Sequence, residues 1–159
     1  MRMFLMATAV LALGAPTAGA QGLVTQKALS MEMAQAIVQG TVERCRADGF
    51  SVSVTVVDAS GLLKAFLRDE GNGPHTIDLS RRKAYTALTF ASRFPTSLAF
   101  AAARGSTLGS PMPNVEGTVG VGGGVPIKVG DVAIGAVGVS GAVGGDKDEV
   151  CANAGIAKV

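Results

Sequence analysis

The sequence contains no tryptophan, one histidine, one tyrosine and six phenylalanines. Charged residues make up 16% of the chain, below the usual ~25%, which excludes a polyelectrolyte or a disordered protein. A formal net charge of +2 excludes a strongly basic nucleic-acid binder, so we expect no nucleic acid among the partners. The 159 residues are enough for one domain and leave no room for a second.

Long apolar runs are also scarce, and the only notable one lies at the N-terminus. Arg2 precedes an apolar run over 3–13, and Ala18-Gly19-Ala20 follows as a small-residue cleavage site. A membrane-spanning helix needs about 18–20 consecutive apolar residues, and this run is shorter. The pattern predicts a cleaved signal peptide over 1–20 and a mature chain over 21–159. We therefore expect an exported protein, periplasmic or secreted, with no membrane span.

Cysteine is nearly absent, with only Cys45 and Cys151. Two distant cysteines and one histidine do not form a ligand set for a structural metal. In an oxidising compartment two thiols can pair. Their spacing along the chain says nothing about their distance in space, so the residues alone leave the pairing open.

Hydrophobic periodicity predicts a chain of helices and antiparallel strands. Apolar residues at three- and four-residue spacing indicate a helix over 30–48, and alternating valines indicate a strand over 51–58. The order of elements is typical of an α+β domain with an antiparallel sheet, and not of an alternating parallel fold. The further elements expected are a strand over 62–68, helices over 78–92 and 96–103, an irregular segment over 104–124, strands over 125–129 and 132–139, and a helix over 147–158.

Glycine is the one abundant residue type, and 14 of the 22 glycines lie in the last 55 residues. A dinucleotide-binding G-x-G-x-x-G motif is not present, because Val125 takes its last position and Pro126 opens a strand. Gly135, Gly138 and Gly141 lie in or just after a predicted strand, where a missing side chain lets something approach the backbone. The candidates are a packed helix, a neighbouring subunit, or a flat ligand.

Three consecutive basic residues lie near the start of the second predicted helix. Arg81, Arg82 and Lys83 fall in its first or second turn, where the helix dipole disfavours cations. One interpretation is a bound anion, a carboxylate or phosphate, held by these side chains and the helix end. The other is a solvated helix face paired with Asp78 or Glu70.

His75 is predicted to lie in a loop just before that helix. A single loop histidine is usually an exposed or hydrogen-bonding residue. It can also ligate a metal already held by a cofactor, because haem iron needs only one or two protein ligands. The neighbouring basic residues would suit the haem propionates, and without a Cys-x-x-Cys-His motif any haem would be non-covalent. Met112 is a second candidate ligand.

Four short stretches, taken together, resemble the GlcG/HbpS family of haem-binding or haem-degrading proteins, which is related to the C-terminal domain of PduO-type proteins. The resemblance covers residues 31–159. The stretches that carry it are VVDASGL at 56–62, RRKAYTA at 81–87, GGVPI at 123–127 and AIGAVGVSG at 133–141.

The resemblance implies a single-domain, profilin-like antiparallel sheet flanked by helices, assembled into ring-like homo-oligomers that are often octamers. It implies a bound haem or related tetrapyrrole, with Lys83 as a pocket or interface residue. In a profilin-like fold the first and last helices pack on the same face of the sheet. If they run antiparallel, Cys45 and Cys151 meet in a disulfide.

Three functions follow as expectations. The leading one is an exported, oligomeric tetrapyrrole-binding protein for redox sensing or haem scavenging, with His75 as the iron ligand and residues 81–83 beside it. A haem-degrading enzyme is the second, so the sequence leaves open whether the protein is an enzyme. The third is an accessory structural oligomer that binds no haem.

Overall fold

The secondary structure follows the predicted order. A computed structural model describes residues 22–106 and 115–159, so the expected signal peptide and Met112 lie outside the described residues. Its elements are α1 (Met31–Ala47), β1 (Ser53–Asp58), β2 (Leu63–Arg68), α2 (His75–Thr89), α3 (Ser97–Ser106), β3 (Gly124–Val129), β4 (Val132–Ser140) and α4 (Gly145–Ile156).

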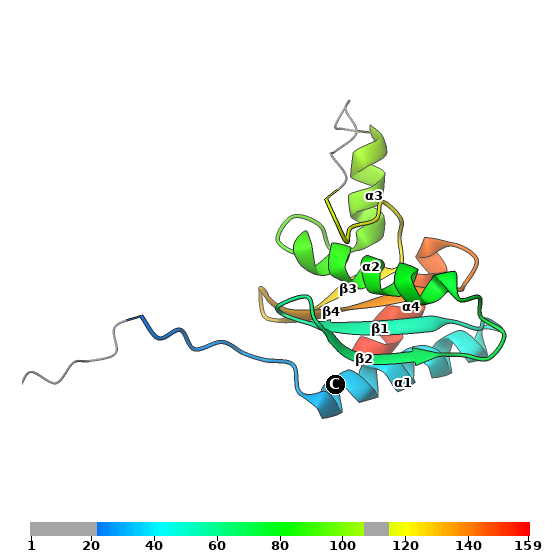
Figure 1. The fold of residues 1–159 in the computed structure, drawn as a ribbon, viewed down its shortest axis with the longest axis horizontal. Helices are drawn as coiled ribbons and strands as arrows, with labels where there is room; N and C mark the ends of the chain where they lie inside the picture. The colour runs from blue at the N-terminus through cyan, green and yellow to red at the C-terminus, as the bar shows by residue number, and fades with distance from the viewer. Residues whose placement is uncertain (1–21, 107–114) are drawn as a thin grey trace, which may run out of the picture.

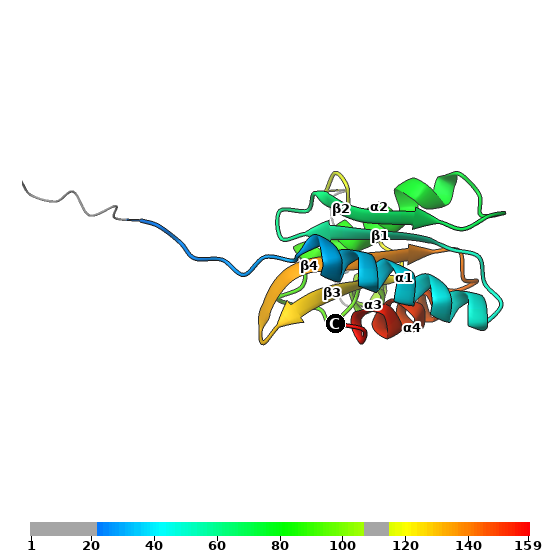
Figure 2. The same ribbon diagram turned by 90° about the horizontal axis from the view of Figure 1, so that it is seen from below.

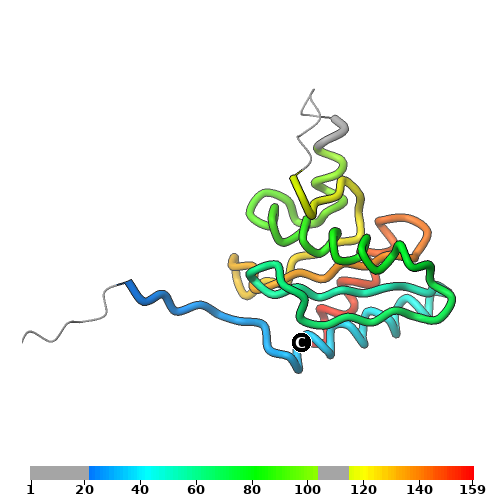
Figure 3. Tube along the Cα trace, in the orientation of Figure 1, coloured from blue at the N-terminus to red at the C-terminus, as the bar shows by residue number. Residues whose placement is uncertain are grey.

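The four strands form one antiparallel sheet in the order β2-β1-β4-β3. Helices α1 and α4 lie side by side on one face, and α2 covers the other face with α3 beside it (Figures 1 and 2). This confirms the predicted α+β class. None of the helices within the described residues has the length and apolarity needed to cross a membrane. Residues 22–28 are exposed and lead away from the body of the domain (Figure 3).

The two faces of the sheet are packed differently. Towards α1 and α4, β1 and β4 contribute fully buried valines that pack against Ile37 of α1 in the main apolar core. Towards α2 a smaller apolar cluster of Val57, Ala84, Ala87 and Ala136 is accompanied by polar contacts. The Ser53 and Thr76 hydroxyl oxygens lie 2.8 Å apart, as do those of Thr55 and Ser80. Hydroxyl pairs of this kind fix the position of a helix along the strands, because buried polar groups need their partners.

Two glycines let α2 come unusually close to the sheet. Gly124 and Gly138 are paired across β3 and β4. A Cβ atom on Gly138 would overlap the Ser80 carbonyl oxygen and lie 2.5 Å from the Ala84 nitrogen. A Cβ atom on Gly124 would overlap the Lys83 carbonyl oxygen. The packed helix is therefore the reason for these strand glycines.

Helix α2 begins at His75, three residues earlier than predicted. Pro74 is its N-cap residue with φ −63°, a value that suits the start of a helix, and the Thr76 hydroxyl donates to the Gly73 carbonyl at 2.6 Å. His75 is thus the first helical residue and not part of the preceding loop. Residues 81–83 lie beyond the first turn, where the dipole effect has faded. The dipole argument for an anion at this helix end is therefore wrong.

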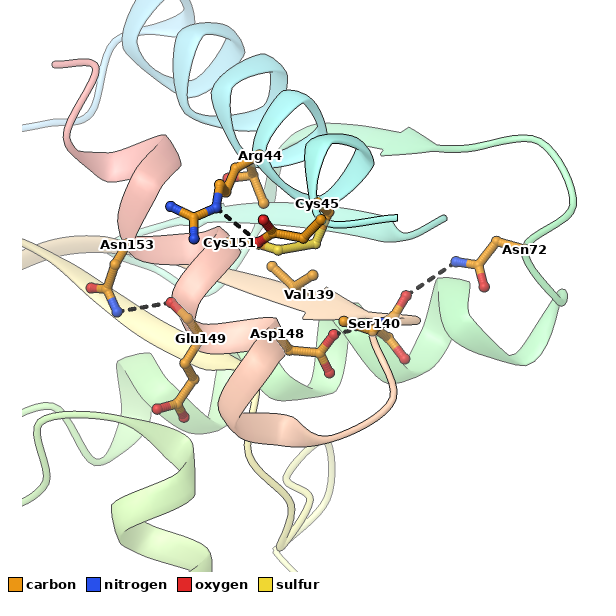
Figure 4. The surroundings of a disulfide bond; sticks show 12 residues. Arg44, Cys45, Asn72, Val139, Ser140, Asp148, Glu149, Cys151 and Asn153 are labelled. Atoms are coloured by element: carbon orange, nitrogen blue, oxygen red, sulfur yellow. Dashed lines mark hydrogen bonds and ion pairs between the residues drawn. A yellow bond between two sulfur atoms is a disulfide. The ribbon is translucent and has the colours of Figure 1, made fainter. Parts of the chain in front are cut away.

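A disulfide joins α1 to α4. Cys45 in the last turn of α1 bonds Cys151 of α4, and both side chains are fully buried (Figure 4). The two residues are 106 positions apart in the chain. The predicted pairing is confirmed.

We expect removal of this disulfide to lower the free energy of unfolding by about 2–5 kcal/mol, because the bond closes a long loop in the unfolded chain. Urea unfolding of wild type and of the double variant Cys45→Ala, Cys151→Ala, each with and without reductant, measures the loss. Reductant should lower the free energy of unfolding of wild type towards that of the variant, and it should leave the variant's value unchanged. Two free thiols in the non-reduced wild type would contradict the prediction.

The close approach of α2 gives a second prediction. Gly138→Ala should cost roughly 3 kcal/mol or prevent folding, because the backbone of α2 has to move away. Gly49→Ala is the matched control. Gly49 has φ +84° with no atom within 4 Å of an added Cβ, so only the strain of about 1–2 kcal/mol applies. Equal losses in thermal unfolding of the two variants would contradict the steric account.

Candidate functional site

A groove of about 470 Å³ lies between the start of α2, the end of β4 and the start of α4. We call it the His75 groove. Its walls combine one imidazole, one buried ion pair and several glycines. The lining residues are Asn72, His75, Thr76, Leu79, Lys83, Val121, Gly122, Ser140, Gly141, Ala142, Gly144, Gly145 and Asp148.

His75 stands at the mouth of this groove with an exposed side chain. Its ring lies against the backbone of Gly73. A Cβ atom there would be 2.8 Å from Cε1 and 2.9 Å from Nδ1 of the imidazole. Within residues 22–106 and 115–159, neither ring nitrogen makes a hydrogen bond. A ligand of the imidazole therefore has no protein hydrogen bond to displace, and the Nδ1 edge of the ring lies against Gly73.

Lys83 and Asp148 form a buried ion pair at the floor of the groove. The Lys83 Nζ lies 2.6 Å from Asp148 Oδ2 and also donates to the Val139 carbonyl at 2.9 Å. The second carboxylate oxygen of Asp148 accepts the Ala142 N–H at 3.0 Å. The pair thus ties α2, β4 and α4 together. Removing one partner would leave the other charge buried without compensation.

Burial dominates the titration of Asp148. It raises the pKa of this carboxyl to about 6, although the Lys83 ammonium and the Ala142 N–H both favour the carboxylate. The neighbouring Asp146 also raises the pKa, by a smaller amount. Asp148 therefore changes its protonation state close to physiological pH.

Glu149, the next residue of α4, holds the opposite wall in place. Its Oε1 accepts the N–H of Leu98 at 2.8 Å and the N–H of Gly123 at 3.2 Å. The first contact anchors the beginning of α3, and the second anchors the glycine-rich segment that leads into β3. Figure 4 shows Asp148, Glu149 and the disulfide residue Cys151 together on the first turns of α4.

The two predicted arginines do not line the groove. Arg81 pairs with Asp78 at 3.0 Å and is half exposed, which is the solvated-face arrangement that the sequence left open. The Arg82 guanidinium donates to the Thr118 carbonyl at 2.7 Å. Of the predicted site residues, the fold thus brings His75 and Lys83 together and leaves Arg81 and Arg82 outside the lining. Their part in cofactor binding stays a prediction.

Sequence reasoning missed three residues of this site. Asp148 and Glu149 look like ordinary first-turn acids of a helix, and only their burial shows their role. Asn72, predicted as loop, donates from Nδ2 to the Ser140 carbonyl at 3.1 Å and to the Ser53 hydroxyl at 3.2 Å. The described part of the chain holds no group of three or more His, Cys, Asp or Glu residues placed to bind a metal ion.

Comparisons with known proteins find matches that extend over the whole domain. A family model described as haem degrading protein HbpS-like matches residues 29–157. A double mutant of HbpS from Streptomyces reticuli is 34% identical, with a TM-score of 0.79, and the match covers 91% of this chain and 96% of that one.

A structure described as HbpS is 32% identical, with a TM-score of 0.78, over 86% of this chain and 93% of that one. A complex of PduOC with haem is 26% identical, with a TM-score of 0.70, over 84% of this chain and 96% of that one. No protein with a curated description matches the chain.

The raised pKa of Asp148 predicts a pH-dependent stability. The folded state holds this proton more tightly than the unfolded chain, whose aspartate pKa is about 3.9. The stabilising contribution is therefore complete below that value and is lost as the pH rises through about 6.

We expect wild type to lose roughly 2–3 kcal/mol between these pH values relative to the double variant Lys83→Met, Asp148→Asn, which lacks both buried charges, measured by urea unfolding. Carbon NMR of the Asp148 carboxyl should give its pKa directly. A carboxyl that titrates near 4 would contradict this prediction.

Proposed function

The chain belongs to the HbpS-like family, and on that premise we propose that it binds haem or a related tetrapyrrole non-covalently in the His75 groove. The observation that carries the proposal is the unpartnered imidazole at the mouth of a groove of about 470 Å³. The description of the family names haem degradation, and the structure of one similar protein, PduOC, is a complex with haem.

The residues present fit such a ligand. An imidazole nitrogen is an ordinary protein ligand of haem iron, and bound haem would supply a redox-active metal. Gly122, Gly141 and Gly144 line the groove with backbone alone, and the space of their missing side chains is taken by neighbouring protein atoms. His75 would hold the iron, and its ring is already braced by Gly73.

Basic side chains along α2 are proposed to meet the carboxylates of the ligand. Arg82 is seven positions after His75 and therefore shares its helix face. Arg81 lies beside it and is half exposed. Lys83 forms the floor, where its charge is already matched by Asp148. The two arginines would reach the ligand by exchanging their present partners, Asp78 and the Thr118 carbonyl.

The proposal includes export and self-association. A buried disulfide favours an oxidising compartment, periplasmic or extracellular. Exposed apolar side chains on the two hairpins, among them Leu62, Leu63 and Val132, favour a homo-oligomer in which they are covered. Such a protein would serve redox sensing or haem scavenging. The family description also favours a second function, the degradation of bound haem.

A hemin titration tests this function. Wild type should shift the Soret band at stoichiometric hemin, and His75→Ala should lose that shift or bind at least about tenfold more weakly. Arg82→Ala should weaken binding without moving the band, whereas Lys27→Ala, an exposed cation on the N-terminal segment, should change nothing.

The outcomes separate the functions. A stable shifted band supports binding alone, and a steady loss of the band with added reductant supports degradation. No spectral change in wild type, or an unaltered shift in His75→Ala, would overturn the proposed site. The absence of any spectral change in wild type would instead favour the third function, an accessory oligomer that binds no haem.

A further inference from the structure

A second groove, of about 430 Å³, lies at the opposite end of α2. It is formed by the β1–β2 turn, the C-terminal half of α2 and the β3–β4 turn, which meet at one end of the sheet (Figure 1). We call it the Tyr85 groove. It shares no lining residue with the His75 groove, so the proposed haem site makes no use of it, although the proposed homo-oligomer would cover Leu62, Leu63 and Val132 on or beside the same two turns.

Tyr85, the only tyrosine of the chain, is held rigidly in this groove. A Cβ atom on Gly61 would lie 2.8 Å from Cε2 of the ring, and one on Gly117 would lie 3.3 Å from Cδ1 and Cε1 and 3.9 Å from Cγ. Both glycines have φ near +80°, and they come from separate loops. The half-buried Tyr85 lines the groove with the part of its side chain that these two loops leave uncovered.

The electrostatics of the groove favour a cation. Asp131 is the only charged residue in its lining, and within the described residues its carboxylate has no ion pair. The last turn of α2 carries no basic residue, and its carbonyl end adds partial negative charge. Lys128 lies nearby, but its ammonium is bound to the Ala91 carbonyl at 3.0 Å and is not part of the lining.

The rest of the lining combines an apolar floor with hydroxyl groups. Leu88 and three alanines supply the floor, and Ser60 and Ser92 stand at the rim. Within residues 22–106 and 115–159, the hydroxyls of Ser60, Ser92 and Tyr85 make no hydrogen bond. A concave surface that combines apolar side chains with free polar groups can hold a small molecule.

We propose that the Tyr85 groove binds a small organic ammonium ion. The ammonium group would lie between the face of the Tyr85 ring and the Asp131 carboxylate, and its hydrocarbon part would rest on Leu88. An ammonium over an aromatic face is attracted by the ring quadrupole, and the carboxylate adds a direct ionic contact. A ligand of negative charge is disfavoured, because no lining residue is cationic.

Choline is the probe that tests this site on haem-free protein. Its matched control is the neutral alcohol in which a carbon atom replaces the choline nitrogen, so the two probes share size and shape. In nitrogen-edited NMR, choline should saturably shift the amides of residues 59–61, 88–92 and 131–133 with a millimolar dissociation constant. The neutral probe should bind about tenfold more weakly.

Substitutions assign the effect to named groups. Asp131→Asn should weaken choline binding several-fold and leave the neutral probe unaffected, and Tyr85→Leu should reduce the preference for the cation to the part that the Asp131 carboxylate provides. Glu43→Gln, which removes an exposed carboxylate on α1, should change neither. Far-UV circular dichroism and thermal unfolding verify that each variant is folded.

Several results would overturn the proposal. They are equal affinity for the two probes, shifts confined to other surfaces, no saturable shift with choline, or unchanged binding in folded Asp131→Asn. None of them bears on the hemin titration, so this site and the proposed haem site stand or fall separately.

Discussion

The close approach of α2 to the sheet is the constraint on which the rest of the structure depends. It exists because Gly124 and Gly138, paired on neighbouring strands, present bare backbone to the helix. The facing side of α2 carries small residues, among them Ala84 and Ala87. Hydroxyl pairs of Thr76 with Ser53 and of Ser80 with Thr55 set the position of the helix along the strands. Larger side chains at this interface would lift α2 away, and everything that α2 carries would move with it.

The buried charges depend on this approach. Lys83 reaches the Val139 carbonyl and Asp148 only because α2 lies so low on the sheet. Two charges out of water carry a desolvation cost, which their contact and the surrounding hydrogen bonds offset only when the geometry is good. The disulfide contributes by holding α4, the helix that bears Asp148, against α1. Burial that outweighs the ionic contact is also why the pKa of Asp148 is raised to about 6.

Helix α2 also connects the two candidate sites. His75 is its first residue, and Tyr85 lies in its C-terminal half, ten residues or about 15 Å further along the axis. In both sites a glycine from a loop braces an aromatic ring: Gly73 beside the imidazole, and Gly61 beside the phenol. The first ring faces a groove with a matched ion pair at its floor, and the second faces a groove with a free carboxylate. The two grooves therefore differ in charge, although one rigid helix presents both rings.

The sequence alone determined the class of the fold and the order of its elements, because alternating valines and three- and four-residue spacings are local signals. Local signals also selected His75 and the 81–83 cluster as candidate site residues. The first residue of α2 was missed although Pro74 is a local signal for a helix start, and the contact of Thr76 with Ser53 that fixes this turn exists only in the fold. Local signals could not separate Lys83, whose ammonium is buried, from Arg81 and Arg82, which lie outside the groove. Asp148 and Glu149 become site residues only when α4 meets α2 and α3, because burial and partner distance are properties of tertiary packing and leave no mark on residue spacing.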